Sequence, residues 1–179
     1  MALSSTVFHV KIDLSDIDRG VYEQLDLRVA RHPSESMRYM LTRVIAYCLS
    51  YEEGISFSKG LSTAEESALW VRDLRGDLQA IIEVGTPSAE RLHKASKSVG
   101  RVIVYTQHDP ALLKRAMTKK VVHRVEEIEV YEIPPRFLDA LEALVERTSD
   151  WSMVRQEGQL YITVGDASVN TEVVRHGLG

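Results

Sequence analysis

Two segments near the N-terminus alternate apolar and polar residues. In residues 4–16, every second side chain from Phe8 to Leu14 is apolar, and residues 20–32 repeat the pattern. A period of two is typical of a β-strand that buries one face. The connection between the segments, SDIDRG, is short and polar. We therefore predict that the two strands pair in an antiparallel manner.

The apolar spacing changes several times between residues 34 and 106. Helical spacing runs from Met37 to about Leu49, and Ser34 is suited to cap the start of this helix. A second helix is predicted to begin at Thr86-Pro87, with Thr86 as its cap. Strands are predicted at 55–60, in SALWVRDL (67–74), in DLQAIIEV (77–84) and in RVIVYT (101–106). The middle two form a hairpin with Arg75-Gly76 as a two-residue turn.

The remaining third of the chain continues this mixture. Helices are predicted at 109–120 and 134–148, a strand at 125–133, and a hairpin over Glu157-Gly158 that a third strand can follow. No repeat or linker divides the chain, which favours one domain. The fold class predicted is α/β (α+β), with one mixed central sheet flanked by helices and antiparallel strands at both ends of the chain.

Composition and charge narrow the class of protein. The 179 residues are 44% hydrophobic and 27% charged, which is ordinary for a globular protein, and the net charge of -4 gives no overall basic signature. No apolar run approaches the roughly 18 residues of a membrane span, and the N-terminus lacks a signal-peptide pattern. We expect a cytoplasmic protein without a membrane partner. The single cysteine, Cys48, is expected to be a buried apolar residue.

Several kinds of site find no support. The six histidines are scattered, so a zinc site is not indicated. The GxSxG elbow, the GxGxxG fingerprint and the GxxxxGK[ST] phosphate loop are all absent. The basic run at 114–124, KRAMTKKVVHR, is most simply a solvated helix end, and its alternative interpretation is a nucleic-acid patch.

Glu83 is an acid at the end of an apolar strand, just before a turn into a helix. Such positions are common sites in α/β proteins, although an ion pair with a neighbouring cation is the simpler interpretation. A metal site needs a further ligand. Asp77 lies six residues along the same strand, about 20 Å away, which is too far. The predicted register places Ala68 opposite Glu83 and Glu66 diagonal to it, so Glu66 ranks above Asp73 as a second metal ligand.

The helix after Glu83 carries the opposite charge. Arg91 and Lys94 share a face, and either could neutralise a phosphate at the end of the sheet. The alternative is a surface ion pair between Glu90 and Lys94. Gly85 allows close approach of a ligand, and the helix N-terminus offers free N–H groups to an anion.

A family resemblance is carried by several separated motifs. The run LRVARHPSES, followed by SALWVRDLRG, IIEVGTPSAERLHKA and VIVYT, resembles the YaeQ family of bacterial proteins over most of the chain. The resemblance implies a single YaeQ-like domain over 1–179. It also implies a variant of the PD-(D/E)XK restriction-endonuclease-like fold, with its nuclease-like core at about 34–106.

The resemblance also implies roles for particular residues. Glu83 matches the second acid of the nuclease motif, and Glu35 lies where an assisting glutamate occurs. The expected lysine is replaced by Gly85, with Lys94 as its substitute from the helix. The first acid is absent at Ser67-Ala68 unless Glu66 or Asp73 replaces it.

Two functions follow as expectations. The first is a Mg²⁺-dependent nuclease that cleaves nucleic-acid phosphodiesters through Glu83, a second carboxylate and Lys94. The second is a catalytically degenerate nuclease fold that binds nucleic acid or a protein.

Overall fold

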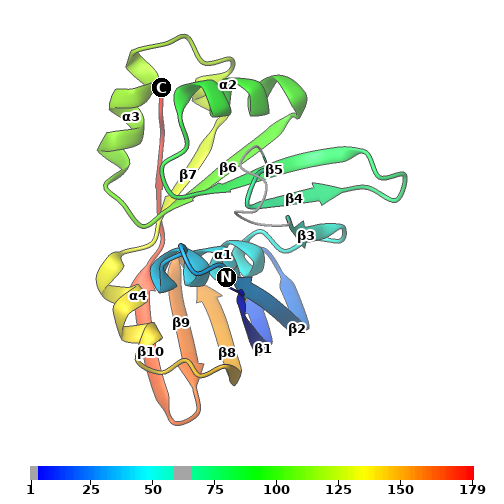
Figure 1. Cartoon of the computed structure of the whole chain (residues 1–179), viewed down its shortest axis with the longest axis vertical. Coiled ribbons are helices and arrows are strands. Elements are labelled where there is room, and N and C mark those ends of the chain that lie inside the picture. The colour runs from blue at the N-terminus through cyan, green and yellow to red at the C-terminus, as the bar shows by residue number, and fades with distance from the viewer. Residues whose placement is uncertain (1–3, 59–65) are drawn as a thin grey trace.

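The computed structural model describes residues 4–58 and 66–179. The last two residues of the strand predicted at 55–60 lie outside these ranges. The described elements form two mixed sheets and four α-helices, a mixed α+β fold (Figure 1). The predicted mixed central sheet is present, but the N-terminal and C-terminal strands build a separate sheet of their own.

The first sheet has five strands in the order β10-β9-β8-β1-β2. The N-terminal hairpin is confirmed, since β1 and β2 pair antiparallel from Thr6–Arg31 to Asp16–Val21. β1 also pairs in parallel with β8, and this contact joins the two ends of the chain. The third C-terminal strand is present as β10. The bounds are Thr6–Asp16 for β1, Val21–Arg31 for β2, Thr148–Gln156 for β8, Gln159–Val164 for β9 and Ala167–Glu172 for β10.

The second sheet has six strands in the order β11-β7-β6-β5-β4-β3. β5, β6 and β7 run parallel, while β3, β4 and β11 are antiparallel to their neighbours. The bounds are Ile55–Phe57 for β3, Leu69–Arg72 for β4, Leu78–Val84 for β5, Arg101–Thr106 for β6, Glu129–Glu132 for β7 and Val174–His176 for β11. Because β5 and β6 are parallel, their carboxyl ends meet at one edge of this sheet.

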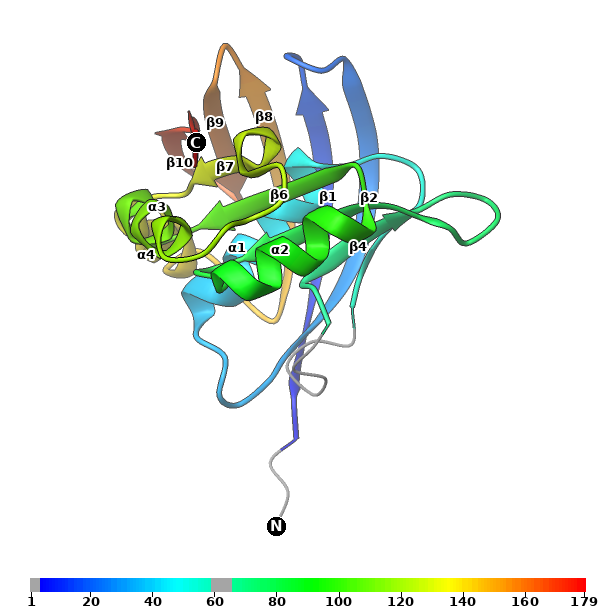
Figure 2. The same ribbon diagram turned by 90° about the horizontal axis from the view of Figure 1, so that it is seen from above.

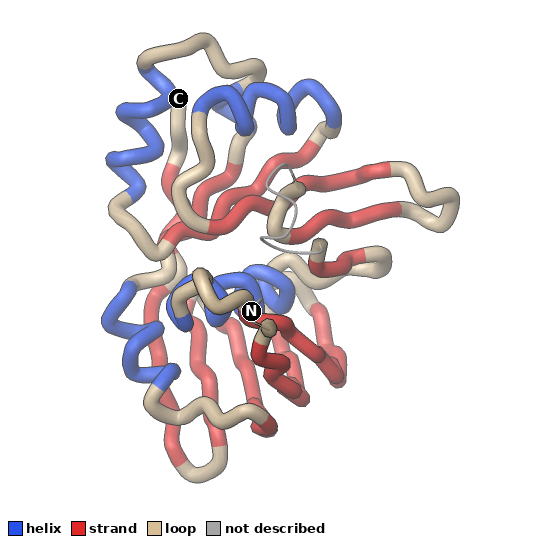
Figure 3. Tube along the Cα trace, viewed as in Figure 1, coloured by secondary structure: helices blue, strands red, loops and turns tan. Residues whose placement is uncertain are grey.

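The four α-helices pack against the faces of the two sheets. α1 (Met37–Leu49) and α4 (Pro135–Glu142) lie between the two sheets, and α2 (Ala89–Ser98) and α3 (Pro110–Thr118) cover the far face of the second sheet (Figures 1 and 3). A short 3₁₀ turn follows at Val125–Glu127. Each side of the second sheet has its own apolar core, one shared with α1 and the first sheet and one shared with α2 and α3. Buried Cys48 belongs to the former, as expected.

Two predicted helix starts are displaced by two residues. Ser36, not Ser34, caps α1 and accepts a hydrogen bond from Tyr39 N. Ser88, not Thr86, caps α2 and accepts from Arg91 N. In both cases the serine two residues further along has the extended backbone that a capping residue adopts.

The hairpin of β4 and β5 has a longer turn than predicted. Asp73 N donates to Asp77 O, and Gly76 N donates back to Asp73 O, so three residues lie in the turn. The register then shifts by one residue between Val71 and Arg72. The two changes cancel. Leu69 pairs with Ile82, so the same register places Ala68 opposite Glu83, as predicted.

Candidate functional site

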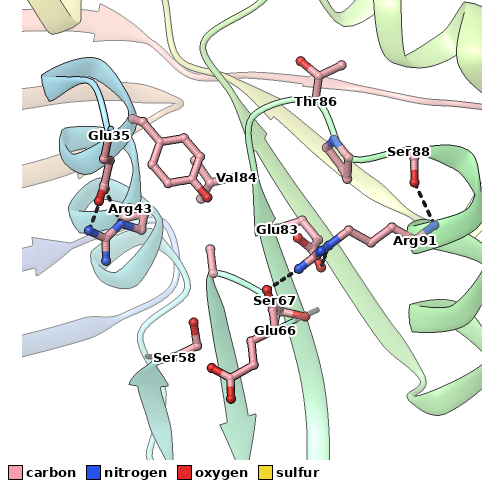
Figure 4. Close-up of a pocket in the computed structure, with 13 residues that line it drawn as sticks. Glu35, Arg43, Ser58, Glu66, Ser67, Glu83, Val84, Thr86, Ser88 and Arg91 are labelled. Atoms are coloured by element: carbon pink, nitrogen blue, oxygen red, sulfur yellow. Dashed lines mark hydrogen bonds and ion pairs between the residues drawn. The ribbon is translucent and has the colours of Figure 1, made fainter. Parts of the chain in front are cut away.

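A cavity of about 360 Å³ lies at the carboxyl end of β5, between α1, β4 and the start of α2. Its walls carry three acids, two arginines and a tyrosine, with small hydroxyl side chains between them (Figure 4). The lining residues that matter below are Glu35, Tyr39, Arg43, Ser67, Glu83 and Arg91. Ile81 packs in the core under α2 and Ile82 in the core beside α1. The alternation along a strand therefore directs Glu83 to the α2 side.

Glu83 forms a largely buried ion pair with Arg91. Arg91 Nε donates to Glu83 Oε1 at 3.0 Å, and only 6% of the Glu83 side chain is exposed. Arg91 also donates through Nη2 to the backbone carbonyl of Glu66. The guanidinium thus links the carboxyl end of β5 to the segment that precedes β4 (Figure 4).

Burial has the largest effect on the pKa of Glu83. Desolvation raises the pKa of this carboxyl above its ordinary value of 4.5, although the charge and hydrogen bond of Arg91 and a hydrogen bond from Ser67 act in the opposite direction. A proton is therefore held more tightly by Glu83 than by an exposed glutamate. Protonation of Glu83 therefore removes the negative charge of this ion pair at the cavity wall.

Glu35 forms the second pair, with Arg43. Arg43 Nε and Nη2 lie 2.8 and 2.6 Å from Glu35 Oε1, and both side chains are almost fully buried. The other carboxylate oxygen accepts from His32 N at 3.2 Å. Because Ser36 caps α1, Glu35 precedes the helix instead of lying within it. Its carboxylate is held by these donors and is not aimed at Glu83.

Tyr39 lies between the two ion pairs. Burial raises the pKa of its hydroxyl, and the charges of Arg43, Glu35, Glu83 and Arg91 all act on it. Its ring lies 3.6 Å from the position that a Cβ on Gly85 would occupy. Gly85 has a φ of +91°, so the turn after β5 requires glycine. The ring of Tyr39 is therefore at an ordinary contact distance from this turn.

The start of α2 opens into this cavity. Thr86, Pro87 and Ser88 line its rim, and Ser88 Oγ accepts from Arg91 N at 3.1 Å. Arg91 is therefore in the first turn of α2, where the helix dipole favours an anion.

Three residues predicted for the site lie elsewhere or point away. Glu66 lines the cavity, but its carboxylate is directed away from Glu83 in Figure 4. Asp73 stays at the turn, where Oδ1 accepts from Arg75 N and Asp77 N at 2.9 Å each. Lys94 lies outside the cavity lining, with 75% of its side chain exposed and its Nζ 3.8 Å from Glu90 Oε1.

Few of the described side chains are therefore placed to bind a cation. Across residues 4–58 and 66–179, no group of three or more His, Cys, Asp or Glu side chains is placed to hold a metal ion. Of the predicted residues, the structure brings Glu83, Glu35, Glu66 and Arg91 to one cavity, and Gly85, Asp73 and Lys94 are not part of its lining.

Sequence reasoning missed Arg43 and Tyr39. Both lie on α1 and follow a spacing of four, which continues to Tyr47. This spacing places them on one helix face. An arginine between two tyrosines on one face of an otherwise apolar helix is the signal that could have identified this wall of the cavity.

Comparisons with known proteins identify the family. The family model described as YaeQ protein matches residues 1–173. The chain belongs to the YaeQ family. A YaeQ relative from Escherichia coli strain K12, named "Uncharacterized protein YaeQ", is 27% identical over 97% of this chain and 95% of its own length.

Two crystal structures of YaeQ proteins have the same fold. The protein from Xanthomonas axonopodis pv. citri superposes with a TM-score of 0.88 at 27% identity, covering 97% of this chain and 99% of that one. The protein from Pseudomonas syringae gives 0.87 at 28% identity, covering 98% of both chains. In the part of the chain that the structure describes, no helix is long and apolar enough to cross a membrane.

Proposed function

We propose that this YaeQ protein binds nucleic acid by holding a backbone phosphate in the cavity at Arg91, on a catalytically degenerate fold of the PD-(D/E)XK type. The observation that carries the proposal is the ion pair between Arg91 and Glu83. The guanidinium pairs with the carboxylate that a metal-dependent nuclease of this type would use to hold a divalent cation. Arginine is suited to this ligand, because its planar fork matches the oxygens of a phosphate.

The electrostatics of the cavity support an anionic ligand. Arg43 is fully engaged by Glu35 and by Ala30 O, whereas Arg91 keeps 29% of its side chain exposed. A phosphate that approaches Arg91 competes with Glu83 for the guanidinium. The raised pKa of Glu83 eases this exchange, since a carboxyl displaced from Arg91 can take up a proton. The N-terminus of α2 adds a favourable dipole.

The order of elements supports the nuclease-like part of the proposal. From α1 onward, the chain forms a helix, a short strand, a hairpin, a helix and a strand parallel to the second hairpin strand. This is the order that the family resemblance implies for the PD-(D/E)XK core. Glu83 ends the second hairpin strand, as the second acid of that motif does.

A Mg²⁺-dependent nuclease is the second candidate. The partial exposure of Arg91 favours it, because rotation of this long side chain would release Glu83 to a cation. In that case Glu83 would hold the ion with water and substrate oxygens, and Glu66 would have to turn toward it.

Binding and cleavage assays separate the two candidates. We expect wild-type protein to bind oligonucleotides in EDTA and the double variant Glu83→Gln/Arg91→Gln to lose this binding. The double variant removes both charges of the pair, so it avoids the destabilisation that a buried charge without its partner would cause. The exposed pair Glu52→Gln/Arg101→Gln is the matched control.

Cleavage of single- or double-stranded DNA or RNA with Mg²⁺ or Mn²⁺, abolished by Glu83→Ala, would establish the nuclease instead. Equal binding by wild type and the double variant would overturn the phosphate site.

A further inference from the structure

The charge of the chain is unevenly distributed. Residues 89–127 contain nine Lys and Arg and four Asp and Glu, a formal charge of +5, although the whole chain carries -4. This positive segment comprises α2, β6, α3 and the loop that follows α3. A local basic surface on an acidic protein is a feature that the overall pI of about 5.9 conceals.

The loop after α3 is fastened along α2. His123 N donates to His93 Nδ1 at 3.1 Å, and Arg124 Nη2 donates to Ser96 O at 3.2 Å and Val99 O at 3.4 Å. Arg124 itself has a φ of +47°, a conformation that these contacts hold in place. Figure 2 shows the loop running beside the helix. Cations from two segments therefore meet on one surface.

We name this the α2 basic surface, and it consists of exposed Lys94, Lys97, Lys119, Lys120, His123 and Arg124. Two acids accompany these cations through solvent-exposed pairs, Glu90 with Lys94 at 3.8 Å and Glu127 with Arg124 at 3.5 Å. Exposed pairs of this kind contribute little to stability, so a competing anion can readily replace the acid. Glu126 is also exposed nearby in sequence.

We propose that the α2 basic surface binds the backbone of a nucleic-acid strand whose neighbouring phosphate occupies the Arg91 cavity, an inference that rests on the proposed function. Arg91 is in the first turn of α2, and Arg124 contacts the carbonyls of its last turn. A helix of ten residues is about 15 Å long. Each strand of duplex DNA carries one phosphate per about 3.4 Å of helix axis, so that length matches about four phosphates of a strand in this form.

The composition of the surface favours a polyanion over a protein partner. Protein interfaces are centred on buried apolar and aromatic residues. Val121 is the exposed large hydrophobic residue of the loop, and Leu112 that of α3. In the sequence, exposed Lys119, Lys120 and His123 flank Val121, and exposed Lys114 and Arg115 follow Leu112.

Fluorescence anisotropy with a labelled oligothymidylate in EDTA tests the surface. The variant is Lys119→Gln/Lys120→Gln. The matched control is Lys11→Gln/Arg28→Gln, which removes two exposed cations from the first sheet. We expect the Kd of the surface variant to rise about tenfold or more, and its slope against log salt to become shallower by about 1.4, or 0.7 per lost phosphate contact. The control should match wild type.

The two variants distinguish a failure of the cavity proposal from a failure of the surface proposal. If the surface variant loses oligothymidylate but the cavity variant Glu83→Gln/Arg91→Gln does not, the surface stands and the proposed function falls. If the surface variant and the control retain the same Kd and salt slope, the inference is overturned whatever the cavity does. Wild-type protein that binds no oligothymidylate overturns both.

Discussion

Arg91 donates from Nε to Glu83 Oε1 across 3.0 Å, at the junction of β5 and the first turn of α2. Glu83 lies near the end of β5, and Arg91 lies in α2. A connection of four residues separates this strand from this helix. A tight connection therefore fixes the pair without any long-range requirement. The same pair sets the charge that the cavity presents to a ligand.

Glu83 is expected to make stability fall as the pH rises. In the unfolded chain its carboxyl titrates near 4.5, and burial raises its pKa in the folded protein. Between these values the folded protein holds a proton that the unfolded chain has released, so the free energy of unfolding decreases with pH, by about 1.4 kcal/mol per unit of pKa difference. Glu83→Gln should lack this decrease when urea unfolding is followed as the pH rises above about 4.5. Parallel curves for the two proteins would contradict the burial argument, and Glu90→Gln is the exposed control.

Gly85→Ala should destabilise the protein through its backbone. A φ of +91° costs a residue with a Cβ about 1–2 kcal/mol, while the nearest atom, on Tyr39, is at an ordinary contact distance of 3.6 Å. Gly100→Ala is the control, because Gly100 has no positive φ and no atom near its added Cβ. Thermal or urea unfolding should separate the two variants. Equal stability would show that the turn relaxes.

Two arginines of α1 should differ sharply in their contribution to stability. Arg43→Met leaves the buried carboxylate of Glu35 unpaired, and we expect a loss of about 3–5 kcal/mol in the free energy of unfolding. Glu35→Gln/Arg43→Met removes both charges and should recover much of that loss. Arg38→Met breaks an exposed pair with Asp139 and should change little. Similar losses in Arg43→Met and in the double variant would mean that packing, not charge, explains the effect.

Asp73→Ala should affect the turn and leave ligand binding unchanged. The carboxylate accepts from two backbone N–H groups and from Gln79 Nε2, and losing these bonds is expected to cost about 1 kcal/mol. Urea unfolding measures that loss, and oligonucleotide anisotropy measures binding. A loss of binding at unchanged stability would return Asp73 to the metal role suggested by the sequence.

Local sequence patterns predicted most of the helices and strands, and the errors in these predictions are also local. The hairpin register at Glu83 was correct although its turn was not, since a three-residue turn and a compensating bulge restore the pairing of Leu69 with Ile82. A bulge leaves no mark on the alternation of apolar residues. The prediction succeeded because two offsets of one residue cancel.

The first sheet could not be predicted from local patterns. The parallel pairing of β1 with β8 joins residues about 140 positions apart, such as Ile12 and Trp151. Alternation identifies each strand but not its partner. The choice between Arg91 and Lys94 was also open, because both share a helix face. Only the residue in the first turn of α2 reaches Glu83, and Lys94, nearly a turn further along, pairs with Glu90.

The affinity of Glu83→Gln for oligothymidylate in EDTA is the most direct test of the central claim. If Arg91 binds a phosphate in competition with Glu83, removing the negative charge of Glu83 should tighten binding by about tenfold, or about 1.4 kcal/mol. The gain should shrink at low pH, where wild-type Glu83 is itself protonated. Binding that is weaker than or equal to wild type would contradict an anion site built on this ion pair.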